Sequence, residues 1–364
     1  MVTGSNHLTL AVAGSRKTQG IVDACAAANP SKRILILTYT TVNQFELRKR
    51  LAEHAGDRPN IEVAGWFSFL IANFVRPFLP YIYRDKRVEG FDFRSPPQQF
   101  TAVNSWSRYF NSEAQVRKVH LPQLAVRLEE ASHQAGIRRL ERSYDQVFVD
   151  EVQDLCGYDL EVLKLLMGSN IDIEMVGDVR QAILATNERE SKNKRFMYMG
   201  IWAWFKAEQN AGRLSITQRV ETWRCRPEIA TLADSLFDTE WGFEPTLSMN
   251  KRETPHDGVF LIRDSDVDAY MAAFRPLVLR NSKVSARNFE YLPFMNFGES
   301  KGLGRERVLI FPTKAIADFL TSRTQLEDKQ AARFYVAVTR AEQSVAVVID
   351  QCGKSAIEYW SPGR

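Results

Sequence analysis

The sequence AVAGSRKTQ, residues 11–19, places Lys17 and Thr18 directly after a short loop that follows an apolar run. In phosphate-binding loops of the form G-x-x-x-x-G-K-[ST], backbone N–H groups surround the phosphates, the lysine reaches the β- and γ-phosphates and the hydroxyl binds Mg²⁺. Here Ala11 opens the pattern instead of glycine, and Arg16 stands where a glycine precedes the lysine. Taken alone, the stretch fits a plain strand–helix connection as well as a nucleotide site.

Two adjacent acids could supply the carboxylate metal ligand and the general base that a phosphate-binding loop lacks. In YDQVFVDEVQDL, a mostly apolar run ends in Asp150 and Glu151. Acids at the carboxyl ends of parallel strands face the edge of the sheet where nucleotides bind in α/β folds. Asp150 can hold the Mg²⁺ shell, and Glu151 can polarise the attacking water. The alternative is a solvated acidic strand end, which is a weaker interpretation in a chain that also has the loop with Lys17.

Three further polar side chains follow apolar or helical stretches. The stretch IEMVGDVRQAI places Gln181 just after a strand-like run, where a glutamine can sense a γ-phosphate. TWRCRPEIA carries Arg224 and Arg226, and RFYVAVTRAEQ carries Arg340. Arginines on a second α/β block can stabilise the charge of a transferred phosphoryl group. Surface ion pairing is the alternative for each arginine.

The elements around these motifs alternate between strand-like and helical stretches. In the first half, strand-like runs lie at 7–13, 33–39, 61–66, 146–151 and 171–178, with helical stretches from Lys17 to about Ala28 and at 44–55. Short apolar strands separated by helices are typical of a parallel sheet covered on both faces. We therefore expect an α/β fold.

A second α/β block begins near Leu214. It contains a helical stretch at 227–237 and strand-like runs at 258–264, 276–280, 289–297, 307–311 and 344–350. Residues 76–140 interrupt the first block, and we expect an inserted, largely helical subdomain there. The predicted domains are therefore 1–213, with this insertion, and 214–364.

Composition narrows the class of protein. The 364 residues are 45% hydrophobic, enough for one large core or two ordinary ones, and the net charge of +4 permits a polyanionic partner without requiring one. The four cysteines are scattered and form no CxxC pair, which disfavours a metal site or a disulfide and favours a reducing compartment. With no signal-peptide pattern and no long apolar run, we expect a soluble, cytoplasmic protein without a membrane partner.

The order of the motifs resembles that of superfamily 1 DNA helicases of the UvrD/Rep/PcrA type, over nearly the whole chain. AVAGSRKT resembles motif I, LTYTTVNQFELRKR motif Ia, AGWFSFL motif Ib, VFVDEVQD motif II and VGDVRQAI motif III. ETWRCRPEI resembles motif IV, GESKGLGRERVLIF motif V and YVAVTRA motif VI. The resemblance implies two RecA-like P-loop domains, with ATP and Mg²⁺ in their cleft and single-stranded DNA across the top.

The resemblance also implies residue roles. The nucleotide-binding positions are Ala13, Gly14, Ser15, Arg16, Lys17, Thr18 and Gln19, together with Trp223, which falls where the family keeps an aromatic that stacks on adenine. The catalytic positions are Lys17, Asp150, Glu151, Gln181, Arg224 and Arg340, and the metal-binding positions are Thr18 and Asp150. For Trp223, packing in the core is the alternative.

Four aromatic residues are candidates for base stacking on single-stranded DNA. Tyr39 and Phe67 sit in motifs that match, whereas Trp202 and Trp204 come later than the family's aromatic after motif III. For these two tryptophans, burial in the core and DNA contact are left open. Base stacking contributes about 1–3 kcal/mol per base without reading sequence.

The chain also departs from the family pattern. Arg16 replaces a glycine, Gly304 stands where an acid usually follows K-G-L, and no convincing glutamine motif precedes residue 11. The span 225–296 is too short for the large 2B subdomain of full helicases. We expect ATP-driven movement along single strands, 3′ to 5′ by resemblance, with poor unwinding of long duplexes, and a partner such as a nuclease in DNA repair or anti-phage defence. The alternatives are a nucleotide-dependent switch that docks a partner without efficient hydrolysis, and RNA as the substrate.

Overall fold

The computed structural model describes residues 4–56, 58–188 and 190–363 and divides the chain into two compact units. The first comprises residues 1–10, 17–177 and 185–217, and the second comprises 11–16, 178–184 and 218–364. The loop 11–16 and the segment 178–184 therefore group with the second unit, although each follows a strand of the first unit. Among the described residues, no helix is both long enough and apolar enough to span a bilayer.

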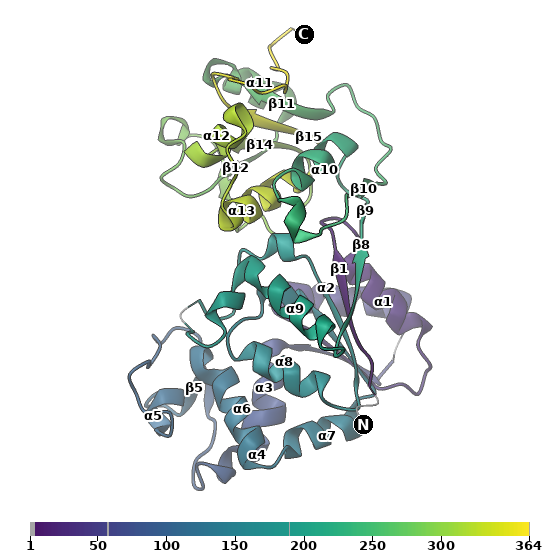
Figure 1. The fold of residues 1–364 in the computed structure, drawn as a ribbon, viewed down its shortest axis with the longest axis vertical. Coiled ribbons are helices and arrows are strands. Elements are labelled where there is room, and N and C mark those ends of the chain that lie inside the picture. Colours follow the sequence, from purple (N-terminus) through teal and green to yellow (C-terminus); the bar gives the residue numbers. More distant parts are fainter. Residues whose placement is uncertain (1–3, 57, 189, 364) are drawn as a thin grey trace. The chain divides into compact units, whose positions relative to one another are not determined.

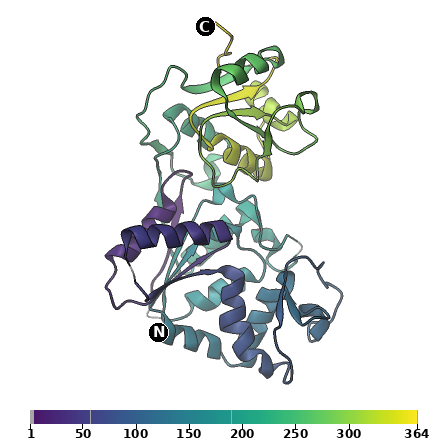
Figure 2. The same ribbon diagram turned by 180° about the vertical axis from the view of Figure 1, so that it is seen from behind.

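The first unit is built on a six-stranded sheet with the order β3-β2-β6-β7-β1-β8 (Figures 1 and 2). Its strands are β1 (Asn6–Ala11), β2 (Ile34–Thr38), β3 (Ile61–Gly65), β6 (Gln146–Asp150), β7 (Asp172–Gly177) and β8 (Ser215–Arg219). The pairs β2–β3, β2–β6, β6–β7 and β1–β7 are all parallel. All five residues of β2 are buried, as expected for a strand covered on both faces.

Helices cover both faces of this sheet. The views in Figures 1 and 2 show α1 (Lys17–Ala27) and α2 (Thr41–His54) on one face, and α8 (Asp159–Met167) and α9 (Ile201–Asn210) on the other. Ile21, Leu47 and Ile36 belong to one buried cluster, which joins α1 and α2 to the sheet. Thr40 begins α2 by accepting a 3.1 Å hydrogen bond from the Asn43 N–H, so this helix starts earlier than the sequence pattern predicts.

The segment expected to be an inserted helical subdomain mixes several kinds of structure. It contains α4 (Arg76–Phe78), α5 (Trp106–Tyr109), α6 (Leu121–Ala131) and the start of α7 (Ala135–Ser143), and also a small parallel sheet of β4 (Gly90–Asp92) and β5 (Gln115–Arg117). The helix leading into it is continuous from α3 (Trp66–Leu70) through a π-helical stretch, Ile71–Val75, to α4. Single π-turns inside helices occur frequently at functional sites.

The second unit has a five-stranded sheet with the order β11-β15-β14-β12-β13. Its elements are β9 (Glu221–Thr222), α10 (Pro227–Asp234), β10 (Leu247–Ser248), β11 (Gly258–Ile262), α11 (Val267–Phe274), β12 (Leu277–Arg280), β13 (Phe294–Asn296), β14 (Arg305–Phe311), α12 (Lys314–Ser322), α13 (Asp328–Val338) and β15 (Ala341–Val348). The four pairs of this sheet are parallel. The α/β class predicted from the sequence is confirmed in both units.

The pleat of β14 shows how this second sheet is covered. Val308 and Ile310 point into a cluster with α10, α12 and α13, whereas Leu309 and Phe311 point into a second cluster with α11. One strand expectation is wrong in extent: residues 289–297 form a strand only at β13. Pro293, just before β13, has no N–H to donate to a ladder, which limits pairing to the three residues after it.

A buried carboxylate joins three segments of the first unit. Asp159 accepts a 2.6 Å hydrogen bond from the Trp66 indole N–H and a further one from the Thr186 hydroxyl. Burial raises the pKa of Asp159 to about 6, although these hydrogen bonds act in the opposite direction. A carboxyl whose pKa is raised by folding stabilises the protein most when it is protonated.

We predict that Asp159 makes the stability of the first unit fall as pH rises from about 4 to 6.5. A shift from 3.8 to about 6 corresponds to roughly 3 kcal/mol of unfolding free energy lost over this interval. Urea unfolding across this range should show the loss in the wild type and in the control Glu53→Gln, which changes an exposed acid. In Asp159→Asn the pH dependence should be smaller by this amount. An unchanged dependence in Asp159→Asn would contradict the assignment.

Candidate nucleotide and nucleic-acid sites

The loop Ala11–Arg16 has two residues in the left-handed backbone region, Gly14 with φ of 77° and Arg16 with φ of 59°. A Cβ on Gly14 would lie 2.6 Å from the Cβ of Arg224, in the same unit, so position 14 needs glycine for space as well as for its conformation. Arg16 adopts a conformation that suits glycine. The local backbone thus explains why phosphate-binding loops keep a glycine here and why arginine is strained.

The side chain of Arg16 lies over an aromatic ring. Its guanidinium carbon is 4.1 Å from the centre of the Trp223 ring, and Trp223 is 47% exposed. The Trp223 N–H donates a 3.0 Å hydrogen bond to the Gly14 carbonyl, and the Thr222 hydroxyl donates one of 2.7 Å to the Ala13 carbonyl. The loop therefore docks on the segment that carries Trp223, and Trp223 is not a core residue.

Ser15 has a buried hydroxyl that is a candidate group for binding an anion. Its side chain is buried, its N–H donates to the Val12 carbonyl, and its hydroxyl has no hydrogen-bond partner in the described part of the chain. A buried hydroxyl without a partner costs free energy, which a phosphate oxygen could recover. In the first unit, Lys17 and Thr18 lie at the N-terminus of the 11-residue helix α1, and the N–H groups of a helix N-terminus also fit an anion.

Asp150 and Glu151 lie at the carboxyl end of β6. The Asp150 carboxylate is buried and accepts a 3.0 Å hydrogen bond from the Glu151 N–H, while the Gln153 amide donates to the Glu151 carboxylate. Glu151 has a φ of 55°, a left-handed conformation of the kind that clusters at functional sites. A side chain on Gly177, at the end of neighbouring β7, would meet Gln153 at 2.4 Å, so this glycine makes room for the turn after β6.

The sheet order fixes the spacing between the two predicted phosphate and metal elements. Only β7 separates β1 from β6, and all three strands are parallel. Their carboxyl ends therefore share one edge, with β1 and β6 about 10 Å apart because neighbouring strands are spaced by roughly 4.8 Å. Lys17 and Thr18 follow β1, and Asp150 ends β6, so all three belong to this edge.

In the second unit, Gln181 and Arg340 contact each other directly. The Arg340 guanidinium donates a 3.3 Å hydrogen bond to the Gln181 side-chain carbonyl, and the Gln181 amide donates one of 2.8 Å to the Asp178 carboxylate. Arg340 is buried and also donates to the carbonyls of Val336 and Leu303. The structure thus brings together two residues predicted from separate motifs.

Sequence reasoning missed the tyrosine that completes this network. The Tyr335 hydroxyl donates a 3.0 Å hydrogen bond to the Asp178 carboxylate and accepts one of 3.2 Å from the Ala13 N–H. Burial raises the pKa of Tyr335 well above its usual value, so the phenol stays a donor. Tyr335 stands in the motif VI stretch, five residues before Arg340, and its type in that stretch is the signal that could have identified it.

Arg224 and Glu342 lie beside Gly304, which has no side chain of its own. Arg224 donates a 3.1 Å hydrogen bond to the Thr339 carbonyl, and its Nε lies 3.5 Å from where a Cβ of residue 304 would be. The Glu342 carboxylate lies 3.5 Å from the same point. An acid is therefore present beside position 304, supplied by Glu342.

Two of the aromatic candidates for base stacking belong to a longer row. Tyr39 packs against Phe67 at 5.6 Å, Phe67 against Phe91 at 5.5 Å, and Phe91 against Phe93 at 4.1 Å between ring centres. Phe67 is 8% exposed, whereas Phe93 is 65% exposed. The Lys118 ammonium lies over the rings of Tyr39 and Phe67 and donates a 3.0 Å hydrogen bond to the Tyr39 hydroxyl. The exposed member, Phe93, lies in the insertion, where the sequence motifs gave no indication of it.

Trp202 and Trp204 do not share this environment. Both lie on α9 and are buried, at 5% and 1% exposed, so neither offers a free ring face to a base. Of the two alternatives left open by the sequence, burial in the core is the one the structure shows.

We predict that Arg16 contributes two opposing terms to stability. Arg16→Gly should change the unfolding free energy by less than about 1 kcal/mol, because relief of the left-handed strain offsets loss of the contact with Trp223. Arg16→Ala keeps the strain and loses the contact, so it should be the less stable of the two by roughly 1 kcal/mol. Chemical denaturation followed by tryptophan fluorescence measures both. Equal stability of the two variants would show that residue 16 is not held in this conformation.

Comparison with known proteins gives one family match. Residues 82–193 match the UvrD/REP helicase N-terminal domain. These residues contain the stretches that resemble motifs II and III, while the loop 11–19 lies outside the match. Among curated proteins, none matches the chain significantly.

Two solved structures share low similarity with the chain. One is the Arterivirus nonstructural protein 10 helicase, with 13% identity, a TM-score of 0.47 and coverage of 94% of the chain and 59% of the helicase. The other is the same helicase in complex with DNA, with 14% identity, a TM-score of 0.48 and coverage of 94% and 61%. The chain thus spans about three fifths of their length. The family match agrees with the resemblance predicted from the motifs within residues 82–193, where the stretches similar to motifs II and III lie.

Proposed function

We propose that the chain is an ATP-hydrolysing motor that moves along single-stranded DNA. The observation that carries the proposal is the shared sheet edge of the first unit, where Lys17 and Thr18 follow β1 and Asp150 ends β6. A lysine, a hydroxyl and a carboxylate at one edge of a parallel sheet are the groups that phosphoryl transfer requires. The family match over residues 82–193 supports a helicase-type motor.

The residues present fit Mg²⁺ with a bound triphosphate. Mg²⁺ prefers oxygen ligands and is usually held by one or two carboxylates together with substrate phosphates, and the Asp150 carboxylate and Thr18 hydroxyl are ligands of that kind. When bound, the ion would neutralise charge that develops on the γ-phosphate. Lys17 would pair with the phosphates, and Glu151 would orient and deprotonate the attacking water.

The second unit would supply the response to the nucleotide. We propose that Arg224 and Arg340 stabilise the charge of the γ-phosphate, that Gln181 reports its presence through Arg340, and that Trp223 stacks on adenine. The contact between Gln181 and Arg340 supports a coupled role for these two residues. Polarity of movement, 3′ to 5′, a nuclease partner and a role in repair or defence rest on the family resemblance alone.

We predict that hydrolysis depends on Glu151. Glu151→Gln should lower DNA-stimulated kcat by about 10²- to 10⁴-fold, the usual contribution of a general base, with the nucleotide still bound. Glu53→Gln, an exposed glutamate on α2, is the matched control and should retain activity. A coupled assay of phosphate release, with and without oligothymidine, measures this. Turnover by Glu151→Gln at the wild-type rate would contradict the role assigned to Glu151. A wild type that binds ATP without hydrolysing it would favour the nucleotide-dependent switch.

We predict that single-strand binding depends on the aromatic row. Loss of one base-stacking ring costs about 1–3 kcal/mol, so Tyr39→Ala and Phe93→Ala should each weaken binding of an oligothymidine by about 5- to 150-fold. Fluorescence anisotropy measures the affinity, with Tyr291→Ala as a control that removes another exposed aromatic. Binding by Phe93→Ala at the wild-type affinity would place the strand elsewhere, and a preference for oligouridine would make RNA the substrate.

A further inference from the structure

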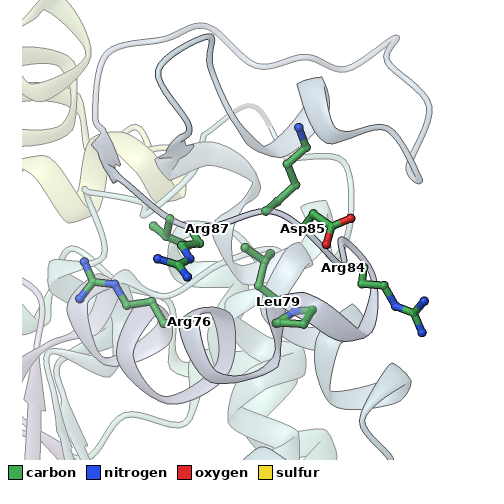
Figure 3. Close-up of a pocket in the computed structure, with 8 residues that line it drawn as sticks. Arg76, Leu79, Arg84, Asp85 and Arg87 are labelled. Atoms are coloured by element: carbon green, nitrogen blue, oxygen red, sulfur yellow. The ribbon is translucent and has the colours of Figure 1, made fainter.

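A basic cavity lies in the insertion (Figure 3), and none of the predicted site residues lines it. It has a volume of about 630 Å³ and is lined by Arg76, Leu79, Pro80, Arg84, Asp85, Lys86, Arg87 and Val88. Four cations and one carboxylate give the lining a net charge of +3. The volume falls in the range of ordinary ligand sites, and the excess of positive charge selects an anion.

Its arginines are not engaged in holding the fold together. Arg76, Arg84 and Arg87 are exposed, and in the described part of the chain none of their guanidinium groups has a hydrogen bond or ion pair. Many other arginines of the chain are paired, as Arg33 is with Asp145 at 2.6 Å. Arg76 directly follows the π-helical stretch, and in the view of Figure 3 it lies with Arg87 on one side of Leu79.

Exposed aromatic rings flank the cavity in the sequence. Tyr81, 60% exposed, directly follows the lining residue Pro80, and Phe93, at the exposed end of the aromatic row, lies six positions after Arg87. Six residues of chain span at most about 20 Å. Cations that track a phosphate backbone, together with rings on which bases stack, are the combination that binds single-stranded nucleic acid.

We propose that this cavity binds the phosphodiester backbone of a single strand, extending the strand's path beyond the aromatic row along the insertion. The proposal rests on the proposed nucleic-acid function and adds a site that the motif residues do not include. Arginine suits the role because its planar guanidinium donates two hydrogen bonds to a phosphate. Asp85 is the only acid in the described lining, and it leaves the excess of positive charge intact.

Salt dependence of binding tests the proposal. For single strands, each phosphate neutralised contributes about 0.7 to the slope of log K against log salt. Replacing Arg76, Arg84 and Arg87 together by glutamine should therefore weaken oligothymidine binding and reduce the slope by about 2. The matched control replaces Arg138, Arg139 and Arg142, three exposed arginines of α7 in the same unit, and should leave the slope within 1 of the wild type. Replacing the three cavity arginines by lysine should restore most of the slope, because the charge is kept.

The outcomes separate this site from the proposed function. A cavity variant that keeps its thermal midpoint and also keeps the wild-type slope overturns the proposal while leaving the motor intact. Equal slope losses in the cavity variant and the α7 control mean that only net charge matters, which also overturns it. A wild type that binds no oligothymidine overturns both this site and the DNA part of the proposed function. Competition by polyglutamate that is lost in the cavity variant, without loss of oligothymidine binding, assigns the cavity to an acidic protein and counts against the proposal.

Discussion

The second unit depends on one buried carboxylate, that of Asp178. It accepts hydrogen bonds from the Tyr335 hydroxyl and the Gln181 amide, and it pairs with Arg180 at 3.3 Å. Tyr335 in turn accepts from the Ala13 N–H. Three segments that are far apart in the sequence are thereby held together: the loop 11–16, the segment after β7, and α13. Because an unpaired buried charge is expensive, each donor holds the next segment in place.

The arginine in the loop is tolerated because its neighbours compensate for it. A left-handed conformation costs a non-glycine residue about 1–2 kcal/mol. The ring of Trp223 returns part of this by stacking against the guanidinium, and Gly14 allows the loop to approach Arg224. The contact of Arg16 with Trp223 therefore offsets part of the strain that arises where glycine is replaced. A nucleotide base that stacked on Trp223, as proposed, would also meet the Arg16 guanidinium.

Much of the fold could be predicted from the sequence, because buried parallel strands are continuous apolar runs and the intervening helices end at recognisable residues. The runs that became β2, β6, β7 and β15 are of this kind. The surroundings of individual side chains were harder to predict from the sequence. Tryptophans two residues apart on α9 read equally as surface or core, since burial depends on what packs against the helix. Tyr335 and Asp178 are 157 residues apart, and no local pattern reports such a hydrogen bond. Phe93 could be identified as a candidate only from the structure, because Phe91 on β4 packs against both Phe67 and Phe93.

The buried network also limits how Gln181 and Arg340 can respond to a ligand. The orientation of the Gln181 amide follows from its partners, since its nitrogen must donate to Asp178 and its oxygen must accept from Arg340. An anion that draws one Arg340 nitrogen toward itself removes the acceptor contact of Gln181 but leaves its donor contact. Arg340 keeps its hydrogen bonds to the backbone carbonyls of Val336 and Leu303, so the guanidinium stays anchored while one edge changes partner. An arginine held in this way can stabilise added negative charge with little reorganisation, which is the condition under which a preorganised group lowers a barrier most.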